Sequence, residues 1–467
     1  MFSRLLSVLL GCSAFAVAQS LSFDLTTIAV NLTPQSLVAG DFNRDGKPDL
    51  AVTGSEGSVA ILLGNGDGTF RAGQVIPVGA SATRIVKADF DQDGKLDLAV
   101  SVGSSGQVMV LLGNGDGSFQ AAFDSGAKAP AGVVASSISP GLSVGDINGD
   151  GKPDLVLGPY LQASTSAMSV LLGKGNGTFQ APVLSTLDPL NGGRAVTLDF
   201  YGDGKSEVFL TADGAPKLDS GLLGGGPDGK LTLTWFGIGF VDSGPAGHPA
   251  VVADANGSGR PDVLALGVDG NQTFRIDAYL NGGFIPIRSD VTVPGNLGVE
   301  TFPLESLAVA DVDGDGKVDL LVSDSYGDLY VMFGNSDGSF QSTGAVFYTG
   351  ASMTYFQTTA DVYGSMTTAD FRGTGQQDVI LALAGKSIVL LKNGGGTPPT
   401  VMPGGVVSAA TVTAVPAVAG SLTTIFGGGF SYDTGAAQDP GFTLGAATAA
   451  MLFGANVKAN GVSAPFL

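Results

Sequence analysis

The apolar residues of this chain fall in short runs, and each run ends at glycine, asparagine or aspartate. The first unit has the pattern in full, with apolar runs at Ser36–Gly40, Asp49–Val52, Ser58–Leu63 and Gln74–Val78. Short runs between turn-forming residues predict β-strands, because helices need longer segments with a period of about 3.6 residues. The pattern therefore predicts an all-β protein.

The turn between the first two runs recurs along the chain. Its form is D-x-[D/N]-x-D-G-x-x-D, four times in full and three times with departures, and it begins at Asp41, Asp89, Asp146, Asp199, Asp254, Asp311 and Asp370. By subtraction, successive copies lie 48 to 59 residues apart. A near-constant period of this size is typical of repeat architectures, and four strands per repeat make one blade of a β-propeller. Seven copies predict a seven-bladed β-propeller.

The seventh unit lacks a clear fourth strand. It supplies runs at Asp378–Leu381 and Ser387–Leu391, after which the chain becomes rich in glycine. The segment 21–29 has the character of a strand but no unit of its own. We expect this N-terminal strand to complete the seventh blade, because a closed ring leaves no open sheet edge.

A second turn, G-N-G-D-G-[ST]-F, follows the third strand of several units. It occurs at Gly64–Phe70 and Gly113–Phe119, and with one or two changes at Gly173–Phe179 and Gly334–Phe340. We interpret it as a hairpin turn whose phenylalanine packs between adjacent blades. The alternative is a second ion site.

The first turn has the chemistry of a calcium loop. Positions 1, 3, 5 and 9 offer side-chain oxygens, position 7 offers a backbone carbonyl, and calcium takes six to eight such hard ligands. Position 6 must bend sharply and is glycine in all seven copies. The four complete loops give the predicted metal ligands Asp41, Asn43, Asp45, Asp49, Asp89, Asp91, Asp93, Asp97, Asp146, Asn148, Asp150, Asp154, Asp311, Asp313, Asp315 and Asp319. The alternative is that the Asp-Gly pairs only make turns.

The other three loops depart from this pattern. The fourth has Tyr201 at position 3 and Glu207 at position 9, and the fifth has Ser258 at position 5. The seventh has Arg372 at position 3, and we expect this guanidinium to replace the cation by pairing with Asp370 or Asp378. The sequence thus predicts about four Ca²⁺ sites, or five if the loop at Asp254 also binds.

Composition and the N-terminus point to an exported protein. Acidic residues outnumber basic ones 42 to 22, the net charge is -20, and no basic stripe suggests nucleic acid as a partner. Residues 1–18 resemble a signal peptide, with cleavage expected after Ala18; the alternative is a lipoprotein acylated at Cys12, the only cysteine. No other stretch is apolar enough to span a membrane. We expect a monomer that is secreted or held at the cell surface, with calcium in place of disulfides.

The strings DFNRDGKPDLAV, DFDQDGKLDLAV, DINGDGKPDLVL and DVDGDGKVDLLV resemble the FG-GAP/VCBS repeats that form the propeller of integrin α-subunits. The resemblance covers residues 21 to about 396 and implies an extracellular calcium propeller, with the loops on one face. We expect the propeller domain to span residues 19–393. Residues 394–402 read as a linker, and 403–467 resemble part of a bacterial Ig-like or TIG-like module. Fold alone does not identify the ligand.

For function we expect a binding or adhesion scaffold for a protein or polysaccharide ligand. The alternative is a carbohydrate-active enzyme, since some calcium propellers are catalytic. The one histidine, His248, lies in a turn-like stretch, and no phosphate-binding loop is present. We therefore predict no enzymatic activity. Four aromatic residues before the seventh loop are candidates for ligand contact, with packing inside the blades as the alternative: Phe347, Tyr348, Tyr355 and Phe356.

Overall fold

The computed structural model describes residues 21–79, 81–103, 107–127, 141–162, 165–187, 195–211, 220–237, 250–268, 273–292, 304–324, 328–347, 366–382 and 386–394, and four short strands beyond residue 400. The expected signal segment with Cys12, the loop with His248, and Tyr348, Tyr355 and Phe356 lie outside these residues. Those expectations remain predictions.

The described chain forms seven four-stranded antiparallel sheets. Blade 1 contains β2 (Pro34–Gly40), β3 (Asp49–Gly54), β4 (Ser58–Gly64) and β5 (Phe70–Pro77). Blade 2 contains β6 (Ala82–Ala88), β7 (Asp97–Val102), β8 (Gln107–Leu111) and β9 (Phe123–Asp124). Blade 3 contains β10 (Leu142–Gly145), β11 (Asp154–Gln162), β12 (Thr165–Leu171) and β13 (Val183–Thr186). Blade 4 contains β14 (Ala195–Leu198), β15 (Glu207–Thr211), β16 (Ser220–Gly225) and β17 (Leu231–Gly237). Blade 5 contains β18 (Ala250–Ala253), β19 (Asp262–Val268), β20 (Phe274–Tyr279) and β21 (Ile287–Val291). Blade 6 contains β22 (Leu304–Ala310), β23 (Asp319–Asp324), β24 (Leu329–Met332) and β25 (Ala345–Phe347). Blade 7 contains β26 (Met366–Ala369), β27 (Asp378–Ala382), β28 (Ser387–Asn393) and β1 (Phe23–Ala29).

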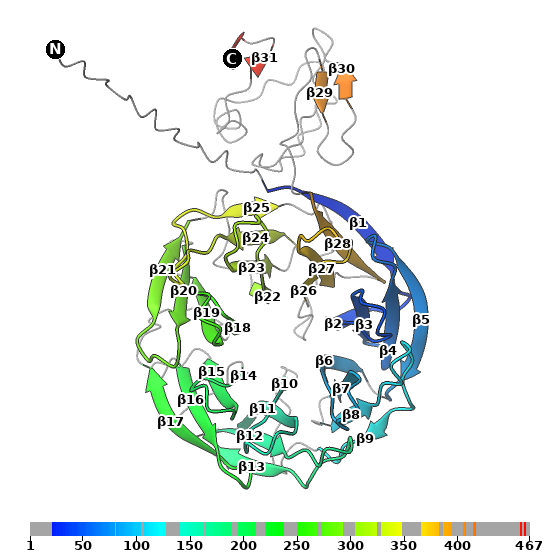
Figure 1. Ribbon diagram of the computed structural model, residues 1–467, viewed down its shortest axis with the longest axis vertical. Helices are drawn as coiled ribbons and strands as arrows, with labels where there is room; N and C mark the ends of the chain where they lie inside the picture. Colours follow the sequence, from blue (N-terminus) through cyan, green and yellow to red (C-terminus); the bar gives the residue numbers. More distant parts are fainter. Residues whose placement is uncertain are drawn as a thin grey trace, which may run out of the picture.

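The blades stand around a central axis, with the first strand of each blade innermost (Figure 1). The innermost strands of neighbouring blades contact one another all the way around the ring. The predicted all-β, seven-bladed propeller is therefore confirmed.

The N-terminal strand β1 lies at the outer edge of blade 7, beside β28 (Figure 1). The two strands are antiparallel, with a register from Phe23 opposite Asn393 to Ala29 opposite Ser387. The ring is thus closed by strands from opposite ends of the propeller, and the β28 edge has a partner along its whole length.

The core consists of the layers between adjacent blades. All residues of the second strands β3 and β7 are buried, because neighbouring blades cover both faces of a blade. One cluster joins Phe42 and Ile61 of blade 1 to Leu98 and Phe119 of blade 2. Strands buried on both faces read as continuous apolar runs, which explains why the sequence lacks a clean two-residue alternation at these strands.

The G-N-G-D-G-[ST]-F turns pack one blade against the next. The Phe119 ring lies edge-on to Phe42 of the preceding blade, at 5.5 Å between centroids, and Phe179 meets Phe90 in the same way at 5.6 Å. The amide of Gly117 also donates to the Phe42 carbonyl at 3.0 Å. The interpretation as a packing turn is confirmed.

Beyond residue 400 the structure describes two small strand pairs, β29 (Gly405–Val407) with β30 (Ala414–Pro416) and β31 (Lys458–Ala459) with β32 (Val462–Ser463). The linker and the Ig-like module remain predictions. Among the described residues, no helix has the length and apolar character to cross a membrane.

Candidate metal centre

The carboxylate at position 1 shapes the loop in every blade. In the first loop, Asp41 Oδ1 accepts the amide of Asp45 at 3.1 Å and Oδ2 accepts the amide of Gly46 at 2.9 Å. All seven copies make both bonds. The glycine at position 6 has φ between 78° and 88° in each copy, a left-handed conformation that side chains disfavour. The loops therefore have one geometry whether or not their ligands are complete.

The carboxylate at position 9 is buried and connects two strands. Asp49 accepts the amide of Phe42 at 2.9 Å through Oδ2 and the amide of Gly64 at 2.8 Å through Oδ1. Asp97, Asp154, Asp262 and Asp319 make the equivalent pair of bonds. The sequence reasoning treated position 9 only as a metal ligand and missed this structural role. The signal was present, because all seven copies keep an acid there, including the three that depart elsewhere.

Burial raises the pKa of these acids. Desolvation is the main cause, and nearby carboxylates add to it, so that the pKa of Asp97 and of Asp154 rises to about 6 and that of Asp319 and of Glu207 to about 7. A raised carboxyl pKa means that the negative charge is poorly compensated by the protein. A bound cation would supply the missing compensation.

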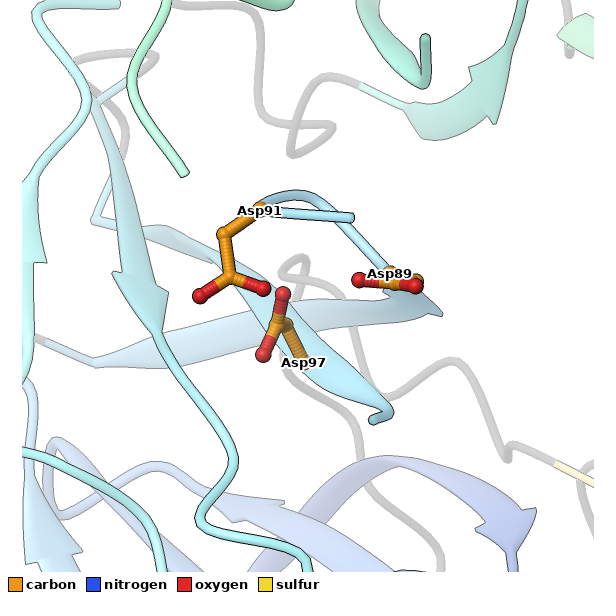
Figure 2. A group of neighbouring side chains, drawn as sticks. All are labelled: Asp89, Asp91 and Asp97. Carbon is orange, nitrogen blue, oxygen red and sulfur yellow. The ribbon is translucent and has the colours of Figure 1, made fainter. Parts of the chain in front are cut away.

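Two groups of carboxylates converge closely enough to share one ion. Asp89, Asp91 and Asp97 each offer an oxygen within 4.8 Å of the others, and Asp311, Asp313 and Asp315 do the same. Figure 2 shows the Asp91 and Asp97 carboxylates facing each other beneath the loop, with Asp89 to one side. Hard oxygen donors on a flexible turn fit Ca²⁺, which prefers such ligands over nitrogen and sulfur.

The other predicted ligands occupy equivalent loop positions, and their part in binding remains a prediction. They are Asp41, Asn43, Asp45, Asp49, Asp93, Asp146, Asn148, Asp150, Asp154 and Asp319. The carboxylate at position 5 pairs with the lysine at position 7 of the same loop. Asp150 lies 3.0 Å from Lys152 in this way, and Asp315 lies 2.6 Å from Lys317. Both side chains of each pair are about one third exposed, so these pairs oppose an arriving ion only weakly.

The seventh loop contains an internal cation. Arg372 Nε lies 3.0 Å from Asp378 Oδ1, and its Nη2 lies 2.8 Å from the same oxygen. The same nitrogen donates to the carbonyl of Asn393. Asp378 is fully buried, so this charge-assisted pair is shielded from water. The predicted pairing of Arg372 is confirmed for Asp378, the second of the two expected partners.

The loss of calcium-dependent stability on mutation is expected to depend on how complete the ligand set of the mutated loop is. Asp315→Ala removes a central oxygen and leaves Asp311 and Asp313 facing each other, so it should cost about 1.4 kcal/mol of calcium-dependent stability, the contribution of one site. Thr374→Ala in the seventh loop should leave the calcium response unchanged. Melting temperatures with calcium and with chelator test both variants. Equal calcium responses would contradict the assignment of the sixth loop.

Calorimetric titration of the calcium-free protein is expected to count about four ions, or five if the loop at Asp254 binds. The fifth loop has less charge, since Ser258 replaces a carboxylate and its hydroxyl is 2.6 Å from Asn281 Oδ1. A count of seven would show that Arg372 does not exclude an ion from the last loop.

Comparison with solved structures finds a lectin that supports the fold. The lectin BP39L from Burkholderia pseudomallei aligns with a TM-score of 0.54 at 15% identity, over 78% of this chain and 98% of the lectin. BBS1N, solved in complex with ARL6DN, aligns with a TM-score of 0.48 at 12% identity, over 79% of this chain and 96% of BBS1N. At such identities the likeness concerns fold alone. A comparison with curated proteins finds no match. The FG-GAP-like repeat matches residues 41–100, 89–157, 146–210 and 311–381, just over half of the sequence, and the chain belongs to this repeat family.

Proposed function

We propose that this chain is an exported, calcium-stabilised propeller that acts as a binding or adhesion scaffold for a glycan or protein ligand. The observation that carries the proposal is the pair of acidic clusters, Asp89/Asp91/Asp97 and Asp311/Asp313/Asp315, on loops of a closed ring. Ions bound there would rigidify the loop face, and a rigid face loses little entropy when it binds a ligand.

Export and calcium support each other in this proposal. Calcium is abundant outside cells, and the only cysteine, Cys12, belongs to the proposed signal segment. A secreted fold without disulfides needs another stabilising element, which the calcium loops would provide. The lectin among the structural neighbours is a glycan-binding protein by its name, and it makes a glycan the first ligand class to test.

A carbohydrate-active enzyme is the rival proposal. The buried acids with raised pKa, such as Glu207 and Asp319, invite this interpretation because general acids often have such values. Their hydrogen bonds favour a structural role instead. Glu207 accepts the Phe200 amide of its own loop at 2.9 Å. Asp319 accepts the amides of Val312 and Gly334, so both acids are engaged in hydrogen bonds that hold the backbone.

One experiment separates the two proposals. A glycan array probed with the full chain, with about 1 mM calcium and again with chelator, tests binding and its ion dependence. Incubation of the retained polysaccharides with the protein, followed by measurement of new reducing ends, tests catalysis. Calcium-dependent retention without chain cleavage supports the scaffold, and cleavage would overturn it in favour of the enzyme.

A further inference from the structure

A group of exposed aromatic and aliphatic side chains lies where blade 4 meets blade 5. Tyr201 is 40% exposed, Phe284 38% and Ile285 90%, and Trp235 on β17 is half-buried beside them. Tyr201 follows β14, and Phe284 and Ile285 lie in the turn between β20 and β21. Side chains of this kind usually avoid water, so an exposed group of them indicates a contact surface.

The rings are held in fixed positions. Phe284 stacks on Trp235 with 5.1 Å between centroids and 22° between planes, and Tyr201 meets Phe284 edge-on at 6.4 Å. Beneath them, Phe200 is 1% exposed and contacts Tyr201 and Phe284 at 5.5 and 5.8 Å. A surface supported in this way needs little reordering when it binds a ligand.

Two departures from the repeat create this surface. Tyr201 occupies position 3 of the fourth loop, where four other loops have Asn43, Asp91, Asn148 and Asp313. The turn of blade 5 reads Asn281-Gly282-Gly283-Phe284-Ile285 in place of G-N-G-D-G-[ST]-F. The change at position 3 therefore removes an oxygen ligand for the metal and adds an exposed ring at the same point.

Polar groups surround the rings. The guanidinium of Arg260 lies over Gly202, where an added Cβ would meet Nε at 3.1 Å, and its Nη2 donates to the Phe200 carbonyl at 3.3 Å. Within the part of the chain that the structure describes, Arg260 makes no ion pair. Among the same residues, neither the Tyr201 hydroxyl nor the Trp235 indole N–H has a hydrogen-bond partner. The surface thus combines flat apolar rings with available donors, as small-ligand sites do.

The size of the surface selects the ligand. At the stated exposures, Tyr201, Phe284 and Ile285 present on the order of 300 Å² of accessible area, taking roughly 200 Å² for a full side chain. A stable protein partner needs about 800 Å² on each side. The area instead matches one or two sugar rings, which offer an apolar face and a rim of hydroxyl groups.

We propose that Tyr201, Phe284 and Trp235 form a platform for a neutral saccharide ring, with Arg260 as a hydrogen-bond donor at its edge. This inference rests on the proposed glycan-binding function. A neutral ligand fits better than an acidic polysaccharide, because the chain has a net charge of -20 and Asp199 and Asp203 lie in the same loop as Tyr201.

The experiment uses the only tryptophan of the chain, Trp235, as a built-in reporter. Trp235 fluorescence emission is followed while the full chain, in the presence of calcium, is titrated with neutral glycans. These are hexasaccharides of glucose, mannose and N-acetylglucosamine, together with any neutral glycans that the array retains. We expect a saturable change with at least one of them. Tyr201→Asn should weaken the apparent affinity roughly tenfold, the loss of one good stacking contact.

The variants preserve the fold for separate reasons. Asparagine already stands at position 3 in other loops, as Asn43 and Asn148, so Tyr201→Asn suits the loop. A second variant, Ile285→Ser, alters a side chain that is 90% exposed and should also weaken binding. Val75→Ala, at a position 64% exposed on blade 1, is the control and should bind like the wild type.

The outcomes separate this inference from the broader proposal. If the array retains a glycan but Trp235 emission does not change, or Tyr201→Asn binds with full affinity, the binding site lies elsewhere. Either result would overturn the platform and leave the broader proposal of glycan binding intact. Retention of no glycan at all would overturn the platform and remove the glycan from the proposed function. Retention of acidic glycans only would contradict the proposed neutral ligand.

Discussion

Chelation is expected to lower the melting temperature of this propeller by on the order of 10 °C, and added calcium should restore it. A site with an affinity of about 0.1 mM contributes roughly 1.4 kcal/mol at about 1 mM free ion, and four independent sites about 5 kcal/mol. The physical reason lies in the loops. Without an ion, Asp89 and Asp91 repel each other, and the buried Asp97 retains a charge that burial disfavours.

The control for this prediction is magnesium. Mg²⁺ requires near-octahedral geometry and gives up water reluctantly, so it should restore little of the lost stability. Differential scanning calorimetry of one preparation, with chelator and with either ion, provides the measurement. An unchanged melting temperature in chelator would refute the calcium assignment, and equal recovery with magnesium would refute its selectivity.

Removal of residues 21–29 is expected to open the ring or to cause aggregation. This deletion takes β1 away from β28 along the full register from Phe23 to Ala29. It also removes the contact of the Phe23 ring with Phe347 of blade 6, at 4.9 Å between centroids. The exposed β28 edge would present unpaired backbone groups on a strand that is otherwise mostly buried, which is a template for pairing with another chain.

The matched control removes residues 398–467, whose described strands β29 to β32 belong to none of the seven sheets. That protein should remain soluble and respond to calcium. Size-exclusion chromatography and thermal melting compare the two deletions. A protein lacking residues 21–29 that stays monomeric with an unchanged melting temperature would show that β1 is not needed for closure.

The repeat made most of the fold predictable. The period gave the number of blades, the missing fourth strand of the last unit indicated where segment 21–29 would lie, and Arg372 at a ligand position indicated an internal ion pair. Each inference needed only a comparison of equivalent positions. Of the four aromatic candidates for ligand contact, only Phe347 lies among the described residues, and its ring packs against Phe23. The exposed rings that the structure describes are Tyr201 and Phe284.

What the sequence could not predict are the contacts that join strands within a blade and side chains across two blades. Asp49 bonds to Gly64, fifteen residues away, because the third strand returns to it, and a one-dimensional pattern does not contain that distance. The stack of Phe284 on Trp235 joins blades 4 and 5 across many residues of chain. Such contacts depend on how the blades pack, which the repeat period leaves open.

The Arg372 pair has a consequence for the junction at which the ring closes. Asn393, which receives a bond from Arg372, lies opposite Phe23 of β1 and donates through Nδ2 to the Val312 carbonyl of blade 6 at 2.6 Å. A guanidinium cannot diffuse away, whereas a bound ion can. As calcium becomes scarce, the ring would lose stability first in the blades with complete calcium loops, which are blades 1, 2, 3 and 6. The Arg372 pair at the junction would remain. The ring could therefore close before calcium binds. It could also lose calcium later without separation of β1 from β28.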